Sequence, residues 1–89
     1  ERGRTTPWQR LLRLVHRRLA HLGAPLPAHL PPRAIATQVR EQFGAPAQPL
    51  VDWLLQLEQA RYAARPQATL RALRNALRNL PWPEKKHSL

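Results

Sequence analysis

The sequence predicts an all-α fold, a compact bundle of four short helices with a proline-rich connector between the first two helices. Apolar side chains recur at the spacing of a helix in four separate segments. Prolines and glycines fall between those segments, where they begin or end helices. No stretch alternates apolar and polar residues with a period of two, and β-branched residues are sparse, so no strand is predicted.

The first helix is predicted to begin at Thr6-Pro7 and to end before Gly23. Thr6 is a favourable N-cap, Pro7 suits the first helical position, and Gln9 completes a capping box. Gly23 is a natural C-terminal stop, because glycine adopts the left-handed conformation at little cost. The apolar face of this helix, the most amphipathic in the chain, consists of Trp8, Leu11, Leu12, Val15, Leu19 and Leu22.

Residues 24–32 contain four prolines and are predicted to form an extended connector that lies over the core. Pro32 can open the second helix, and Gly44 ends it. The apolar face of this second helix carries Ile35, Val39 and Phe43. A short turn through Pro46 then leads to the third helix.

The third helix is predicted to start near Gln48-Pro49 and to precede a break at Arg65-Pro66. It has two adjacent apolar faces, one with Leu50, Trp53, Leu54 and Leu57 and the other with Val51, Leu55 and Tyr62. Its solvent face consists of Asp52, Gln56, Gln59 and Ala63. A helix this apolar is predicted to be the central one.

The fourth helix is predicted to run from about Gln67 to Leu80 and to stop at Pro81. Its inward residues are Leu70, Leu73, Leu77 and Leu80, and its basic side carries Arg71, Arg74 and Arg78. The chain is thus divided into a linker at residues 1–7, a helical domain at residues 8–81 and a tail at residues 82–89. Of the tail, only Trp82 is expected to pack.

Length and composition limit the classes of function. The 89-residue chain is one domain, and 43% of its residues are hydrophobic, which suits the dense core that so short a chain requires. It carries 15 basic and 5 acidic residues, a net charge of +10, which favours an anionic partner such as nucleic acid or an acidic membrane surface. There is no cysteine, which excludes disulfides and thiolate chemistry. No apolar run reaches membrane-spanning length, and the start at Glu1 suggests a segment of a longer protein.

No catalytic residue, cofactor site or metal site is predicted. The acidic residues are scattered over the termini and different helices, and the only serine, Ser88, lies in the predicted tail. His16 and His21 are five residues apart on one helix and face different directions, while His29 and His87 lie in the connector and the tail. The histidines are interpreted as solvated surface residues. The chain is expected to act by packing, binding or tethering.

The candidate anionic-surface contact consists of arginines on and beside the polar face of the first helix, namely Arg10, Arg13, Arg17 and Arg18. Two interpretations remain open. A charged outer face needs no function, because solvent-exposed helix faces are usually charged. The net charge, with Arg2 and Arg4 just upstream, favours contact with an anionic surface. The same two interpretations apply to the basic side of the fourth helix. Trp8 fits a position in the core better than the position of an interfacial anchor.

Glu58 and Arg61 are a candidate structural ion pair on the third helix. Arg61 falls on the apolar face, where an unpaired charge would be costly. Glu58 lies one turn earlier and would offset that cost, with Tyr62 packed beside the pair. Recognition of a partner by these residues is the alternative.

Several features occur together between about Trp8 and Leu80. They are the opening helix that ends at Gly23, the run Pro31-Pro32-Arg33-Ala34, the helix that ends Phe43-Gly44, the segment Leu57-Glu58-Gln59-Ala60-Arg61-Tyr62-Ala63 and a last leucine-rich helix. In these features the chain resembles the C-terminal domain of unknown function of bacterial membrane-anchored transglutaminase-like proteins, of the protein-glutamine gamma-glutamyltransferase type. Pro31 and Ala34 stand where many members have Thr and Glu, so the capping box of the second helix is missing. Ala63 stands where many members have Gly.

The resemblance implies a parent protein with several membrane helices, a periplasmic papain-like domain and a final membrane helix before this segment. The catalytic Cys, His and Asp would lie in that other domain, and none maps onto a residue of this chain. The chain would be a non-catalytic accessory or interaction domain on the cytoplasmic face of the bacterial inner membrane, with residues 1–7 as a membrane-proximal linker. Its partners would be the membrane and catalytic domains of the parent chain, with anionic lipid or a cytoplasmic protein. Arg2, Arg4, Arg10 and Arg13 agree with that side of the membrane, where basic residues flank membrane helices.

Two other functions remain open. A small basic nucleic-acid-binding module is the main alternative, and its candidate recognition residues on the fourth helix are Arg71, Arg74, Asn75, Arg78 and Asn79. The chain lacks a recognisable helix-turn-helix signature, which counts against this function. The third possibility is a structural end-cap that stabilises or dimerises the parent protein and needs no ligand.

Overall fold

The computed structural model describes residues 6–60, 62 and 64–84 of the chain. These residues contain four α-helices and one short 3₁₀ helix. The elements in chain order are α1 (Pro7–His21), α2 (Pro32–Phe43), η1 (Ala45–Ala47), α3 (Gln48–Ala60) and α4 (Pro66–Arg78). No strand occurs in these residues, so the predicted all-α fold is confirmed. No described helix has both the length and the apolar composition needed to cross a membrane.

The predicted capping box opens α1. The Thr6 hydroxyl accepts a hydrogen bond from the Gln9 backbone N–H, and the Gln9 side-chain oxygen accepts one from the Thr6 backbone N–H, each at 3.2 Å. Backbone N–H groups that would otherwise lack partners at the helix start are thereby satisfied. At the start of α2, by contrast, the N-cap Pro31 provides no side-chain hydrogen bond, in agreement with the missing capping box there.

Glycines follow α1 and α2 at the predicted places, and both have positive φ angles, 88° at Gly23 and 73° at Gly44. After α1, the Ala24 N–H donates to the Leu19 carbonyl at 2.8 Å, and the Gly23 N–H donates to the Ala20 carbonyl at 3.1 Å. This pair of hydrogen bonds is the Schellman motif. It requires a left-handed residue at position 23, a conformation that glycine adopts without a steric penalty.

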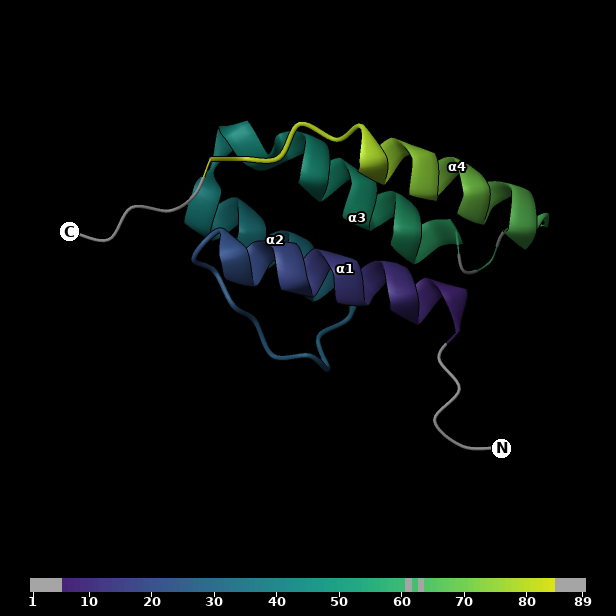
Figure 1. Ribbon diagram of the computed structural model, residues 1–89, viewed down its shortest axis with the longest axis horizontal. Helices are drawn as coiled ribbons and strands as arrows, with labels where there is room; N and C mark the ends of the chain where they lie inside the picture. Colours follow the sequence, from purple (N-terminus) through teal and green to yellow (C-terminus); the bar gives the residue numbers. More distant parts are fainter. Residues whose placement is uncertain (1–5, 61, 63, 85–89) are drawn as a thin grey trace.

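The helix α3 is the central one, as its apolar composition predicted. It packs against α2 and α4, and Figure 1 shows it between α4 on one side and α1 with α2 on the other. Its buried residues are Leu50, Val51, Trp53, Leu54, Leu57 and Ala60. The other helices add Leu11, Val15, Leu19, Ile35, Ala36, Val39, Leu73 and Leu77 to the core. The Trp53 indole N–H donates to the Leu73 carbonyl at 2.9 Å, which satisfies a buried polar group and joins α3 to α4.

The proline-rich connector between α1 and α2 lies over the core, as predicted. Ala24 is buried, and Leu26 and Leu30 are half-buried against the core. A turn brings the Leu30 N–H within 3.3 Å of the Pro27 carbonyl. In Figure 1 the connector forms a loop on the side of α1 that faces away from α4. The two flanks of α1 therefore have different neighbours, the connector on one side and α4 on the other.

The C-terminal region differs from the prediction in where its elements end. The last helix spans Pro66–Arg78 and is capped by Asn79, whose side-chain amide donates to the Asn75 carbonyl at 3.1 Å. After α4 the chain continues toward the end of the molecule where α1 ends (Figure 1). There Trp82 is half-buried against the core, as expected, and Pro83 is buried. Pro83 therefore packs in addition to Trp82, the one tail residue that was expected to pack.

The second apolar face of α3 is less buried than its sequence suggests. Val51 is buried, but Leu55 is 37% exposed and Tyr62 is 83% exposed. Tyr62 lies in the turn after α3 ends at Ala60, so the helical register that placed it beside Val51 does not apply. The expectation that Tyr62 packs at the edge of the core is wrong for this reason.

Candidate functional site

A groove of about 530 Å³ lies between α1 and α4. Four arginines and a histidine line it, and none of its lining residues is acidic. We call it the basic groove. Its basic residues are Arg17, Arg18, His21, Arg74 and Arg78, and its apolar residues are Leu11, Leu14, Leu77, Leu80 and Trp82.

The groove side of α1 begins where its buried face ends. The buried residues of this helix are Leu11, Val15 and Leu19. Leu14, Arg17, Arg18 and His21 are related by steps of three and four residues, which places them along one side of the helix. Leu14 is 47% exposed, although it is a large apolar residue. An apolar side chain therefore reaches the surface among basic ones.

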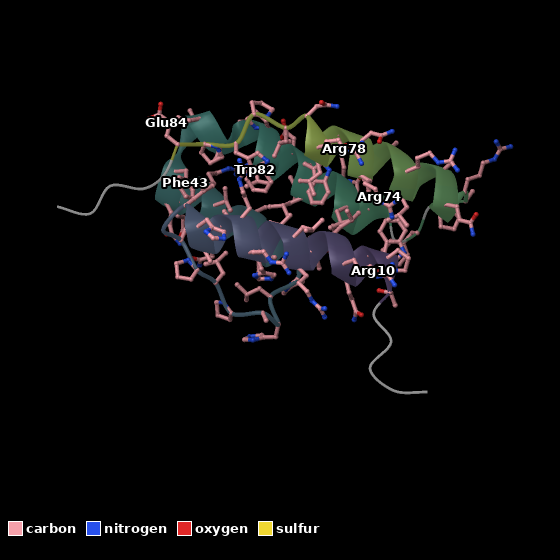
Figure 2. All side chains as sticks on the ribbon, viewed as in Figure 1. Arg10, Phe43, Arg74, Arg78, Trp82 and Glu84 are labelled. Carbon is pink, nitrogen blue, oxygen red and sulfur yellow. The ribbon has the colours of Figure 1, made fainter. Side chains whose placement is uncertain are left out.

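Arg74 and Arg78 extend from α4 on successive turns (Figure 2). Each directly follows a buried leucine, Leu73 or Leu77. The next residue lies about 100° further round a helix, at the edge of the buried face. An arginine at such an edge covers apolar surface with its methylene groups and keeps its guanidinium group in water. Arg74 and Arg78 of α4 therefore line the same groove as the basic residues of α1.

Trp82 lines the groove from the segment that follows α4. The guanidinium carbon of Arg18 lies 5.2 Å from the centroid of the Trp82 ring, which is within the range of a cation–π interaction. Trp82 is itself half-buried against the core, and the neighbouring Pro83 is buried. The ring therefore provides a fixed support for the Arg18 side chain.

The charges around the basic groove repel one another, because arginine stays protonated throughout the physiological pH range. No carboxylate lines the groove to compensate them. Two of the acidic residues lie elsewhere, with Glu41 exposed on α2 and Asp52 on α3 accepting a hydrogen bond from the Gln48 side chain at 2.8 Å. A bound anion would relieve this repulsion, and guanidinium groups bind phosphate and carboxylate oxygens in a bidentate manner.

The four arginines predicted to contact an anionic surface are all exposed, but they do not share one site. Arg17 and Arg18 line the basic groove. Arg13 lines a different cavity on the connector side of α1. Arg10 lines neither and lies near the start of α1, where Figure 2 labels it. The structure thus joins half of the predicted set to Arg74 and Arg78 of α4.

Leu14 and Trp82 were not predicted from the sequence to belong to this site. Leu14 offered a signal, because it is a large apolar residue that falls outside the apolar face of its helix. Trp82 offered none, because its contact with Arg18 joins residues 64 positions apart along the chain (82 − 18).

A second cavity, of about 690 Å³, lies between α1, the connector and α3. Its polar residues include Arg13, His16 and His29. Both ring nitrogens of His16 are shielded from solvent and lack a hydrogen-bond partner among the described residues. Burial lowers the pKa of His16 from its ordinary value of 6.5, because the charged form loses hydration. The interpretation of His16 as a solvated residue is therefore wrong, whereas His29 is exposed.

The predicted ion pair joins Glu58 to Arg61, and Arg61 lies outside the described part of the chain. Glu58 is half-buried, and its Oε1 atom is shielded from solvent without a hydrogen-bond partner among the described residues. The pair stays a prediction.

Within residues 6–60, 62 and 64–84, no group of three or more His, Asp or Glu side chains could hold a metal ion. Ser88 and His87 lie outside these residues. The basic groove is therefore taken as the candidate functional site.

Comparisons of the chain with protein-family models, curated proteins and solved structures gave no match. The resemblance to the C-terminal domain of transglutaminase-like proteins thus rests on the sequence motifs described above.

Proposed function

We propose that this chain is a non-catalytic interaction domain that binds an anionic membrane surface through the basic groove. The observation that carries the proposal is the convergence of arginines from α1 and α4 on one groove that has no acidic lining residue. Guanidinium groups bind lipid phosphates through short, charge-assisted hydrogen bonds. The net charge of +10 adds a long-range attraction to the same surface.

Leu14 favours a lipid surface over a purely polar polyanion. Its side chain is 47% exposed and lies among the basic residues of the groove. A membrane interface accommodates both kinds of group, because arginine heads remain at the level of the phosphates while apolar side chains enter the acyl boundary below. A polyanion without apolar surface would leave Leu14 in water.

Within a longer protein, we propose that the chain is the cytoplasmic C-terminal accessory domain of a membrane-bound transglutaminase-like enzyme. Support comes from the motifs between Trp8 and Leu80 and from the basic residues near the N-terminus. A tether beside the inner leaflet would keep the groove at a high effective concentration near the headgroups. The encoded sequence upstream of Glu1 tests this assignment, which requires a segment of about 20 apolar residues there. A polar upstream sequence would contradict the proposal of a membrane-bound parent, but not the proposal that the groove binds an anionic membrane surface.

Vesicle co-sedimentation of the 89-residue chain tests the lipid proposal. We expect binding to vesicles that contain phosphatidylglycerol and little binding to phosphatidylcholine alone. Each basic residue near an anionic surface contributes about 1 kcal/mol, so the double variant Arg74→Gln/Arg78→Gln should bind about thirtyfold more weakly. Equal binding to the two kinds of vesicle would contradict the proposal.

The matched control is Arg33→Gln/Arg40→Gln, which removes the same charge from exposed positions on α2. Neither residue lines the basic groove. Because exposed charges are screened over about 8–10 Å at ordinary salt, this control should bind within about threefold of the unmodified chain. An equally large loss in the control would mean that net charge alone, and not the groove, determines binding.

Nucleic acid is the alternative anionic partner. The fourth helix was its candidate recognition helix, but Asn79 uses its side-chain amide to cap that helix at Asn75. Arg74 and Arg78 flank a groove that is shared with α1. A gel shift with duplex DNA at low salt, without vesicle binding, would favour nucleic acid and overturn the lipid proposal.

A further inference from the structure

The arginines of the basic groove form two pairs on its two helical walls. Arg17 and Arg18 are adjacent on α1, and Arg74 and Arg78 are one turn apart on α4. A lipid phosphodiester carries one negative charge, so a single phosphate leaves most of the charge of these four arginines without a counter-charge. A ligand that carries two phosphates can place one on each wall and compensate both pairs.

The groove has the size of a small-ligand pocket. Its volume of about 530 Å³ lies within the range of small-ligand pockets, about 300–1,000 Å³. This size suits a lipid headgroup.

The apolar residues of the groove distinguish a lipid from a free phosphate compound. Leu14 of α1 and Leu80, which follows α4, contribute apolar surface to the groove that the arginines line. This surface suits the glycerol bridge and the first methylene groups of acyl chains, which a free phosphate compound lacks. Trp82, in contact with Arg18, limits the motion of that side chain, so less conformational entropy is lost on binding.

We propose that the basic groove selects a lipid whose headgroup carries two phosphates joined by a short bridge, as in cardiolipin, with one phosphate at each arginine pair. This inference rests on the proposed function, because it names the lipid that the groove prefers. The inference goes beyond that function because the site requires the arginine pairs of α1 and α4 together. A general attraction to anionic membranes requires only charge.

The experiment compares two vesicle preparations of equal surface charge in co-sedimentation. One contains cardiolipin, and the other contains twice as much phosphatidylglycerol. We expect the unmodified chain to bind the cardiolipin vesicles at least about tenfold more tightly. Inorganic phosphate, added in excess at constant ionic strength, should leave that preference unchanged, since it lacks the apolar part of the ligand. Displacement by phosphate would overturn the lipid assignment.

Variants then separate the two walls. Arg17→Gln/Arg18→Gln and Arg74→Gln/Arg78→Gln should each abolish the preference, so that both vesicle types bind equally. The control Arg33→Gln/Arg40→Gln should retain it, and circular dichroism should show the same helix content for all three variants. A preference that survives in either groove variant would overturn the two-wall site. Equal binding of the unmodified chain to both vesicle types would overturn this inference and leave the proposed function intact, whereas binding to neither would end both.

Discussion

Arg18 of α1 and Trp82, which follows α4, are in cation–π contact, with 5.2 Å between the guanidinium carbon and the ring centroid. The contact joins the first helix to the C-terminal end of the described chain. It also connects the core to the basic groove, because the ring packs on the core with one part and on a groove arginine with another. Stability and binding should therefore be coupled at this pair.

The coupling can be measured with a double-mutant cycle of Arg18→Gln and Trp82→Leu. We expect an interaction energy of about 0.5–1 kcal/mol from urea unfolding, the value typical of exposed cation–π pairs. A second cycle that pairs Arg17→Gln with Trp82→Leu is the control, since Arg17 lines the same groove on the same helix. It should be additive. Additivity in the Arg18 cycle would show that the contact contributes nothing to stability.

The hydrogen bond from the Trp53 indole to the Leu73 carbonyl should contribute measurably to stability. Trp53→Phe removes this buried bond at 2.9 Å and leaves a space where the larger ring was. The combined loss should be about 1–3 kcal/mol in urea unfolding. Trp8→Phe at a half-buried position is the comparison and should lose less. Equal losses would mean that ring volume alone accounts for the effect.

The capping box of α1 provides a test at the surface. Thr6→Ala removes the hydroxyl that accepts from the Gln9 N–H and should reduce the free energy of unfolding by about 1 kcal/mol. Thr37→Ala is the matched control, because Thr37 lies inside α2 with its hydroxyl bonded to the Arg33 carbonyl at 3.2 Å. Alanine has the higher helix propensity there, so no loss is expected. A loss at position 37 as large as that at position 6 would contradict this account.

The imidazole of His16, which is half-buried with both ring nitrogens shielded from solvent, should make stability depend on pH. Its pKa is lowered in the folded state because burial removes hydration from the charged form, so the unfolded chain binds the proton more readily. The contribution of neutral His16 is fully present above about pH 6.5 and is lost as the pH falls through the folded-state pKa. The urea midpoint should therefore decrease between about pH 7.5 and about pH 5.

Substitutions isolate this effect from that of the other titrating groups. His16→Leu should show a smaller decrease of the urea midpoint on acidification, because no proton can bind at that position. His29→Leu, at an exposed position of the connector, should behave like the unmodified chain. The same pH dependence in the unmodified chain and in His16→Leu would exclude His16 as the cause.

The helices could be read from the sequence because their signals are local. The Thr6-Pro7-x-Gln9 capping box, the stops at Gly23 and Gly44 and the openings at proline act through backbone hydrogen bonds and φ angles within a few residues. The periodic leucines identified the buried faces for the same reason. The apolar pattern of α3 continues in the sequence to Tyr62, but the helix ends at Ala60. The predicted burial of Tyr62 was wrong for this reason.

The sequence by itself determined the helical class, the positions of the four helices, the central place of α3 and an excess of positive charge. Only the tertiary structure decided which charges act together. It separated Arg13 from Arg17 and Arg18 and set that pair opposite Arg74 and Arg78. It also shielded the ring nitrogens of His16 from solvent and brought Trp82 to Arg18. The physical reason is that helix periodicity fixes a direction around one axis, whereas the neighbour in that direction depends on how the helices pack around their shared core.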